Sequence, residues 1–240
     1  SKNLENLPRI VGGVTPECTE RAAAFLSQVS KDIRKTDYRT AELTKPLENA
    51  FLHVAVSLAN EMATLYPQLD TAQAVELACT HWRLPKIYQS LGQGGRCVPL
   101  GPRYLMAGTK DKAGYGVLNA AVDQEADTCT QAMFAIKNRI KPGGRVLVMG
   151  IAYRPGFKDA GSSPGLALAH ELWGEGFRVE VGDPMWCARE LEHLARLPVW
   201  RAWEVASHPF YNVDAIVLAT PHVEFREVIE AALADDDDRE

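Results

Sequence analysis

One cysteine of this sequence stands where a nucleophile could be exposed. Cys97 follows Gly94-Gly95-Arg96, in a stretch rich in glycine and proline from Leu91 to Pro102 that we predict to be a loop. Glycines beside a cysteine let a substrate approach the backbone, and they expose N–H groups that can stabilise an oxyanion. A thiolate in such a loop could attack a carbonyl carbon. The alternative is a structural thiol, because most free cysteines are buried small side chains.

A second group of candidate residues follows three predicted strands. The first strand begins at Arg145 and is stopped by Gly150, and Tyr153 and Arg154 come directly after it. An arginine at this place suits a phosphate group. His222 follows the third strand, where it either contacts a ligand or simply caps the chain. Because ligands of parallel α/β sheets bind at the carboxyl ends of the strands, these residues are candidates for one site.

The second half of the chain has the pattern of a parallel α/β domain. Apolar runs at 145–150, 178–183 and 214–220 alternate with helical patterns at 164–176, 185–197 and 223–233. Strands that alternate with helices predict βαβ units and a Rossmann-like parallel sheet. No Gly-x-Gly-x-x-Gly follows a strand, so the sequence contains no recognisable turn for the pyrophosphate of NAD.

The first half is predicted to be mainly helical. A short strand at 9–13 precedes a helix at 16–31, and further helices are expected at 70–82 and 114–138. The strongest helix starts near Thr44 and is ended by Pro67. It carries an apolar stripe at helical spacing, formed by Leu47, Phe51, Val54, Leu58, Met62 and Leu65. A turn at 141–144 marks a candidate domain boundary.

Composition excludes several classes of protein. The net charge of −5 argues against a nucleic-acid partner, and no apolar run is long enough to span a membrane. The start of the chain lacks the apolar region of a signal peptide. The 5 cysteines are widely spaced and form no CxxC pair, so we expect neither a metal site nor a redox pair. A reducing cytoplasm is the expected location.

Several segments together resemble the UDP-glucose/GDP-mannose dehydrogenase family, and they occur in that family's order. Arg9–Gly13 resembles the last strand of the family's N-terminal domain. The other segments are Ala41–Asn49 with Asn60-Glu61, Gly94–Pro99, Met149–Pro155, Ser163-Pro164, Gly182–Pro184 and Thr220–Phe225. The resemblance implies a remnant of an N-terminal Rossmann domain at 1–38. It also implies a helical central dimerisation domain at 39–140 and a Rossmann-like nucleotide-sugar domain at 141–240.

The resemblance also assigns roles to individual residues. Members of the family oxidise the C6 alcohol of a sugar nucleotide twice, passing hydride to NAD and forming a cysteine thioester. Cys97 matches the nucleophile, Lys45 the lysine that stabilises the oxyanion, and Asn49 a neighbouring polar contact. The substrate-binding positions implied in this way are Gly94, Gly95, Arg96, Tyr153, Arg154 and His222. The long central helix implies a homodimer.

Some positions depart from the family's pattern. Gly101 stands where the family has an aspartate that helps to activate water, Arg96 where it has a histidine, and Gly161 where it has an arginine. Pro46 directly follows Lys45, which is unusual for the family. Because only the last strand and helix of the NAD-binding domain are recognisable, we expect no cofactor to be bound by this chain alone. NAD would act only if a missing domain were supplied.

Three hypotheses follow. The first is a truncated family member, retasked in a biosynthetic pathway, that uses Cys97 and Lys45 for NAD-independent carbonyl or acyl chemistry on a small molecule or nucleotide sugar. The second is a fragment of an NAD-dependent nucleotide-sugar 6-dehydrogenase that needs its NAD-binding half. The third is a non-catalytic dimeric binding scaffold.

Overall fold

The structure, a computed structural model, describes residues 5–109, 115–200, 210 and 213–237. Two compact units are present: residues 1–53 with 97–118, and residues 54–96 with 119–240. The long helices α2 (Tyr38–Leu65) and α5 (Gly116–Arg139) each have residues in both units. Each unit is described by itself below.

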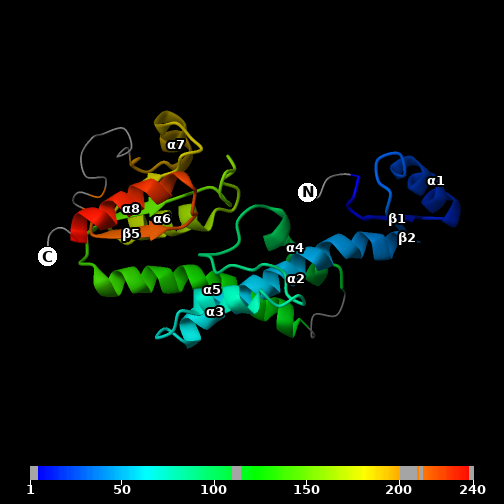
Figure 1. Ribbon diagram of the computed structural model, residues 1–240, viewed down its shortest axis with the longest axis horizontal. Coiled ribbons are helices and arrows are strands. Elements are labelled where there is room, and N and C mark those ends of the chain that lie inside the picture. The colour runs from blue at the N-terminus through cyan, green and yellow to red at the C-terminus, as the bar shows by residue number, and fades with distance from the viewer. Residues whose placement is uncertain (1–4, 110–114, 201–209, 211–212, 238–240) are drawn as a thin grey trace. The chain divides into compact units, whose positions relative to one another are not determined.

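The first unit begins with a βαβ motif. Strands β1 (Arg9–Gly13) and β2 (Ile33–Asp37) pair in parallel, and α1 (Pro16–Leu26) connects them (Figure 1). The strand at 9–13 and the helix start at Pro16 confirm the sequence-based expectations, although α1 ends before residue 31. Strand β2 was not predicted, because its sequence Ile-Arg-Lys-Thr-Asp carries a single apolar residue.

Helix α2 begins earlier than the sequence predicts. Its start is set by Asp37, whose Oδ1 accepts hydrogen bonds from the backbone N–H groups of Arg39 and Thr40 at 3.0 and 3.1 Å. We expected a start near Thr44, because Pro46 is tolerated best in a first turn. Pro46 lies instead inside the helix. Its ring removes one N–H donor from the helical hydrogen-bond ladder.

The expected loop at 91–102 is in part a helix, which corrects the sequence-based prediction. Helix α4 (Cys97–Ala107) begins at the candidate nucleophile itself. Pro99, Gly101 and Pro102 hid this helix from the sequence analysis, since glycine and proline disfavour helix interiors. Gly101 and Pro102 are buried. The short helix α3 (Thr71–Ala78) ends before the predicted Trp82.

The second unit contains the predicted Rossmann-like domain. Its sheet has the order β4-β3-β5, all parallel, with β3 (Arg145–Met149) in the centre, β4 (Arg178–Gly182) and β5 (Ala215–Leu218). The helices are α6 (Pro164–Gly174), α7 (Ala188–Ala195) and α8 (Glu224–Asp237). The mixed helical and parallel-sheet fold confirms the expected α/β class.

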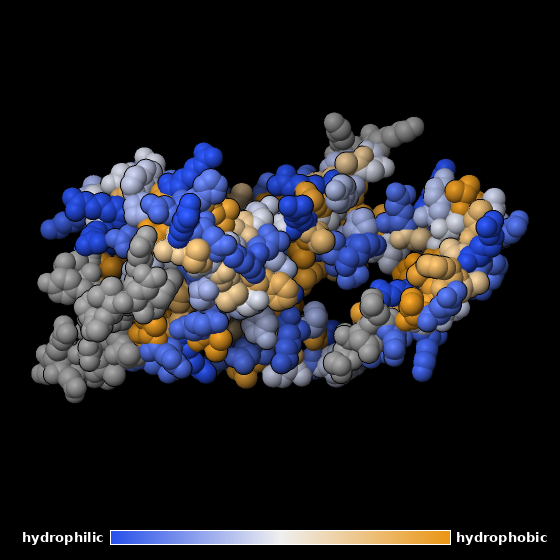
Figure 2. Space-filling model, turned by 90° about the horizontal axis from the view of Figure 1, so that it is seen from above, coloured by the Kyte–Doolittle hydropathy of each residue, from blue (hydrophilic) through white to orange (hydrophobic). Residues whose placement is uncertain are grey.

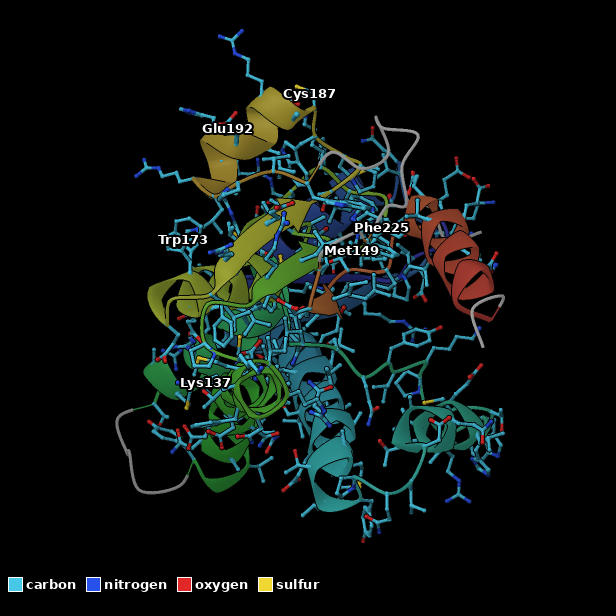
Figure 3. All side chains as sticks on the ribbon, turned by 90° about the vertical axis from the view of Figure 1, so that its left-hand side faces the viewer. Lys137, Met149, Trp173, Cys187, Glu192 and Phe225 are labelled. Carbon is cyan, nitrogen blue, oxygen red and sulfur yellow. The ribbon has the colours of Figure 1, made fainter. Side chains whose placement is uncertain are left out.

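Helices cover both faces of this sheet. Val146 and Val148 of β3 pack with buried residues of α5, α6 and α7. The alternate residues of β3, Leu147 and Met149, pack on the other face against Trp200 and Phe225. Figure 3 shows Met149 and Phe225 on neighbouring elements. The chain passes from β3 to β4 on one side of β3, whereas β5 lies on the other side. Ligands of such sheets bind at the carboxyl ends of the two strands between which the direction of the connections changes, here β3 and β5.

Apolar side chains are also exposed. On the βαβ motif they are Ile10, Val14, Phe25 and Val29, and Figure 2 shows hydrophobic surface at this end of the chain. On α2 the predicted stripe is largely exposed, with Phe51 at 70% and Leu58 at 56% relative exposure. Within the described residues, no helix is both long and apolar enough to cross a membrane.

Candidate functional site

The loop after β3 is held by residues from the ends of the two neighbouring strands. Asp183, after β4, accepts hydrogen bonds through Oδ2 from the N–H groups of Ile151 and Ala152 at 2.8 and 2.9 Å. Thr220, after β5, donates from Oγ1 to the carbonyl oxygen of Ala152 at 2.6 Å. Gly150 (φ +89°) lies so close to Thr220 that a Cβ atom there would stand 2.5 Å from it. The loop therefore leaves the sheet in a fixed direction.

His222 lies inside this arrangement, with its side chain fully buried. Its Nδ1 accepts a hydrogen bond from the Gly156 N–H at 3.3 Å, and its Nε2 faces Asp183 Oδ2 at 3.2 Å. Burial alone raises the pKa of the Asp183 carboxyl. The His222 imidazole and the N–H groups of Met185, Ala152 and Ile151 outweigh burial and hold that pKa below its usual value. Asp183 is therefore a buried carboxylate that accepts hydrogen bonds from three backbone N–H groups.

The glycines before Cys97 pack on the same loop. Gly95 (φ +82°) donates its N–H to the Gly161 carbonyl at 2.7 Å. A Cβ atom on Gly94 would lie 2.7 Å from Tyr153 Cβ, and one on Gly95 would lie 3.1 Å from the Tyr153 ring. Both positions need glycine because the chain passes flat against Tyr153. Here the structure brings together the predicted residues Gly94, Gly95 and Tyr153.

Two arginines stand beside this contact. The Arg154 guanidinium carbon lies 3.3 Å from the centre of the Phe157 ring, with the Tyr153 ring 5.6 Å away. Stacking fixes the guanidinium plane and leaves its N–H edges available to an anion. Arg96 is exposed, and its Nε lies 4.0 Å from the position of a Cβ atom on Gly161. A cationic group thus stands beside Gly161, the position where the resembling family has an arginine.

In the first unit, Cys97 is the exposed first residue of α4. One turn later, Gly101 lies flat against α2: a Cβ atom there would stand 2.6 Å from Asn49 Cβ and 3.0 Å from the Pro46 carbonyl oxygen. The structure therefore brings the predicted residue Asn49 to the helix that begins with Cys97.

Lys45 forms an exposed ion pair on α2. Its Nζ pairs with Glu48 Oε1 at 2.9 Å, and both side chains are exposed. Gly101 meets α2 at residues 46–50, whereas Tyr104, Leu105 and Gly108 share a surface hollow with residues 39–46. Helix α4 therefore runs antiparallel to α2, and Lys45 lies on the far side of the Gly101 contact from Cys97. No contact between Lys45 and Cys97 follows from this arrangement.

In the βα turns after β1 and β3, side chains accept hydrogen bonds from backbone N–H groups. After β1, the Gly13 N–H donates to Thr19 Oγ1 at 2.9 Å, and Thr15 Oγ1 accepts from the Cys18 N–H at 3.2 Å. After β3, Ser163 caps α6 in the same way, accepting from the Leu166 N–H. The N–H groups of Gly13, Cys18 and Leu166 are thus engaged within the protein and are not available to an anion. Across the described part of the chain, no three His, Cys, Asp or Glu side chains are placed to hold a metal ion.

The fold defines a parallel α/β domain that follows a helical region. A sequence model described as "UDP-glucose/GDP-mannose dehydrogenase family, central domain" matches residues 39–125, and that family's "UDP binding domain" matches residues 147–236. The chain belongs to the UDP-glucose/GDP-mannose dehydrogenase family.

Individual relatives agree with this membership. The UDP-N-acetyl-D-mannosamine dehydrogenase of Pyrococcus horikoshii is 30% identical over 234 residues, which are 95% of this chain and 53% of the relative. That of Campylobacter jejuni is 29% identical over 72% of this chain and 44% of the relative. The solved structure of the Pyrococcus horikoshii enzyme has a TM-score of 0.77 at 30% identity and covers 92% of this chain and 52% of its own. The chain spans about half the length of the curated relatives it matches.

Sequence reasoning missed some members of the site. Asp183, Thr220 and Phe157 were not among the candidate residues, although they hold or stack on the loop that carries Tyr153 and Arg154. A signal was present, because Asp183 and Thr220 both stand at carboxyl ends of predicted strands. Phe157 gave no such signal.

Proposed function

We propose that this chain binds a nucleotide sugar carrying a uridine diphosphate group, and that the loop after β3 receives the diphosphate. One observation carries the proposal: the Arg154 guanidinium is already stacked on Phe157 at the carboxyl end of the central strand. An arginine held in one orientation loses little conformational freedom when it binds phosphate oxygens. The matching family description of this domain and the named activity of the relatives support the choice of uridine diphosphate.

Isothermal titration calorimetry with UDP and with UDP-N-acetyl-D-mannosamine tests this binding. Arg154→Ala should weaken UDP binding by about tenfold to a hundredfold, the range for a charge-assisted hydrogen bond. Arg178→Ala is the matched control, because Arg178 is also exposed but starts β4 at the opposite end of the sheet. Equal affinities of the two variants, or no binding to the unaltered chain, would contradict the proposal.

The second part of the proposal concerns Cys97. Its thiolate adds to a substrate aldehyde to give a hemithioacetal, or takes an acyl group from a substrate ester or thioester and releases the alcohol or thiol; neither step needs a redox partner. Exposure at the first residue of α4 supports this role, since the first turn of a helix offers N–H groups that have no partner within the helix. Hydride transfer to NAD would need a dinucleotide-binding site other than the turns after β1 and β3.

Protection from alkylation tests the Cys97 proposal. Saturating UDP-N-acetyl-D-mannosamine should slow the reaction of Cys97 with iodoacetamide severalfold, as measured by peptide mass spectrometry. Cys187 is an internal control, because it is also exposed but lies at the start of α7. An unchanged rate at Cys97 under saturation would argue against a site role. The same alkylation rate of Cys97 tests Lys45. It is measured in Lys45→Ala and in Lys35→Ala, because both lysines are exposed and ion-paired.

The third part of the proposal is a homodimer formed through α2. The exposed stripe of this helix, including Leu47, Phe51, Leu58 and Leu65, is an apolar surface of the kind that a second copy covers. Light scattering at micromolar concentration should show a dimer, and Phe51→Glu should dissociate it. Ala63→Glu, on an exposed part of the same helix away from the stripe, should leave it intact. A monomer under these conditions would exclude this interface.

A further inference from the structure

The loop that carries Tyr153, Arg154 and Phe157 is anchored at two places. Near the sheet, Asp183 and Thr220 hold residues 151 and 152, as described above. Further along, the Gly156 N–H donates to Nδ1 of His222. Gly156 has φ +74°, and nothing lies within 4 Å of the position where its Cβ atom would be. The turn between Arg154 and Phe157 is therefore not packed against other atoms on the Cβ side of Gly156. The hydrogen bond to His222 holds its backbone in place.

The hydrogen bonding of His222 determines where its proton lies. Because Nδ1 accepts from Gly156, the proton of the neutral ring is on Nε2, the atom that faces Asp183 Oδ2 at 3.2 Å. Both ring nitrogens are thus directed at protein groups, and the side chain is fully buried. The two nitrogens of this buried ring face Gly156 and Asp183 rather than the surface.

We propose that His222 is a positioning residue: it holds the turn at Gly156, and through it the Arg154–Phe157 stack, in the form that receives a nucleotide diphosphate. The inference rests on the proposed function and replaces the direct substrate contact expected of His222 from the sequence. The Asp183 carboxylate orients the ring, the ring orients the Gly156 N–H, and Phe157 follows Gly156 in the chain. Arg154 stacks on Phe157 at 3.3 Å.

Two substitutions separate the two ring nitrogens. In His222→Asn the side-chain oxygen stands close to the place of Nδ1, so it can still accept from Gly156 but no longer reaches Asp183. In His222→Gln the amide nitrogen stands close to the place of Nε2, so it can still face Asp183 but the acceptor for Gly156 is lost. Both variants lose the edge-on contact of the ring with Phe225 at 5.6 Å, so this loss cancels in the comparison.

UDP affinity by calorimetry and hydrogen exchange of the Gly156 amide by NMR test the inference. We expect His222→Asn to bind UDP within about threefold of the unaltered chain and to keep the slow exchange at Gly156. We expect His222→Gln to bind about tenfold more weakly, a change within reach of one hydrogen bond, and to exchange faster at Gly156. Melting temperatures of both variants are recorded, since a purely structural role would lower affinity and melting temperature together.

Each other outcome overturns the inference in a recognisable way. If both variants bind UDP as tightly as the unaltered chain, His222 does not position the site, while the proposed UDP site stands. If both lose affinity equally, the ring has only a structural role or contacts the ligand itself. If the unaltered chain binds no UDP, the proposed function fails, and this inference fails with it.

Discussion

The carbonyl oxygen of Pro46 lies 3.0 Å from the place where a Cβ atom on Gly101 would stand. These two residues are both departures from the pattern of the family, and the structure brings them together where α4 lies against α2. Gly101 also comes so close to Asn49 that a Cβ atom would stand 2.6 Å from the Asn49 Cβ. The two helices meet backbone to backbone, and an aspartate at position 101 has no room in this packing.

Adding one methyl group at Gly101 tests this close contact. Gly101→Ala should destabilise the chain by about 1–3 kcal/mol, the usual cost of overpacking. Gly116→Ala is the matched control: Gly116 is also helical, but no atom lies within 4 Å of its Cβ position. That substitution should be neutral or stabilise by up to about 1 kcal/mol, because alanine favours helix. Urea unfolding measures both, and equal effects would show that α4 does not pack on α2 in this way.

The parts of the fold that the sequence predicted are those with a strong local signal. Helix α6 begins at Pro164, as predicted, and the structure shows Ser163 as its N-cap with proline in the favoured first position. Strand β2 and helix α4 were missed for the opposite reason. The strand is polar, and Gly101 in α4 satisfies a tertiary contact rather than a helical preference. Such a contact overrides propensity and is invisible in the local sequence.

The same limit applies to the candidate site. Strand ends in a parallel sheet identify Tyr153, Arg154 and His222 as neighbours, and this rule needs no side-chain detail. Whether a residue faces the ligand or the protein depends on the path of the loop. The path is set by Asp183 and by Gly156, whose N–H reaches the His222 ring. Periodicity contains no information on that path.

Gly150 and Gly143 offer a matched pair to test the loop after β3. Both have positive φ, +89° and +80°, but only Gly150 is crowded, with its Cβ position 2.5 Å from the Thr220 carbonyl oxygen. Gly143→Ala should destabilise by about 1–2 kcal/mol, the cost of left-handed backbone for alanine. Gly150→Ala should cost about 3 kcal/mol or more, because the clash adds to this strain. Thermal unfolding measures the difference; similar melting temperatures would mean that the loop has another path.

Cysteine reactivity follows from the local environments. Burial raises the pKa of Cys129 to about 11, with a smaller contribution from Glu171. At pH 8 only about one Cys129 thiol in a thousand is then ionised, and its alkylation should be far slower than that of the exposed Cys187. Rates by peptide mass spectrometry check this order. In urea the two should react alike, and fast alkylation of Cys129 in the native chain would contradict its burial.

Cys18 should be unusually reactive for an exposed thiol. Hydrogen bonds from Thr15, first through its side chain and then through its backbone, lower the pKa of Cys18. Thr15→Ala should therefore slow the alkylation of Cys18 near neutral pH, whereas Thr15→Ser keeps the hydroxyl and should preserve the rate. The rate at Cys187 is the internal reference. If alanine and serine at position 15 act alike, the hydroxyl does not stabilise the thiolate.

Acid should remove the stabilisation that Asp183 gives the fold. Its pKa is lowered in the folded chain, because the His222 imidazole and backbone N–H groups outweigh the effect of burial. The unfolded chain therefore binds the proton more readily, and the free energy of unfolding falls as the pH falls. The contribution is complete above the ordinary aspartate value, near 3.9. It is lost as the pH falls through the lowered value of the folded chain.

Asp183→Asn measures this contribution. At pH 7 the substitution should destabilise by about 3 kcal/mol, because it removes a buried charge from its partners and points an amide N–H at backbone donors. The difference from the unaltered chain should shrink steadily below pH 4 in urea unfolding experiments. Asp123→Asn, on the exposed face of α5, is the control and should differ little at either pH. A difference for Asp183→Asn that stays constant down to pH 2 would mean that folding does not lower the pKa of this carboxyl.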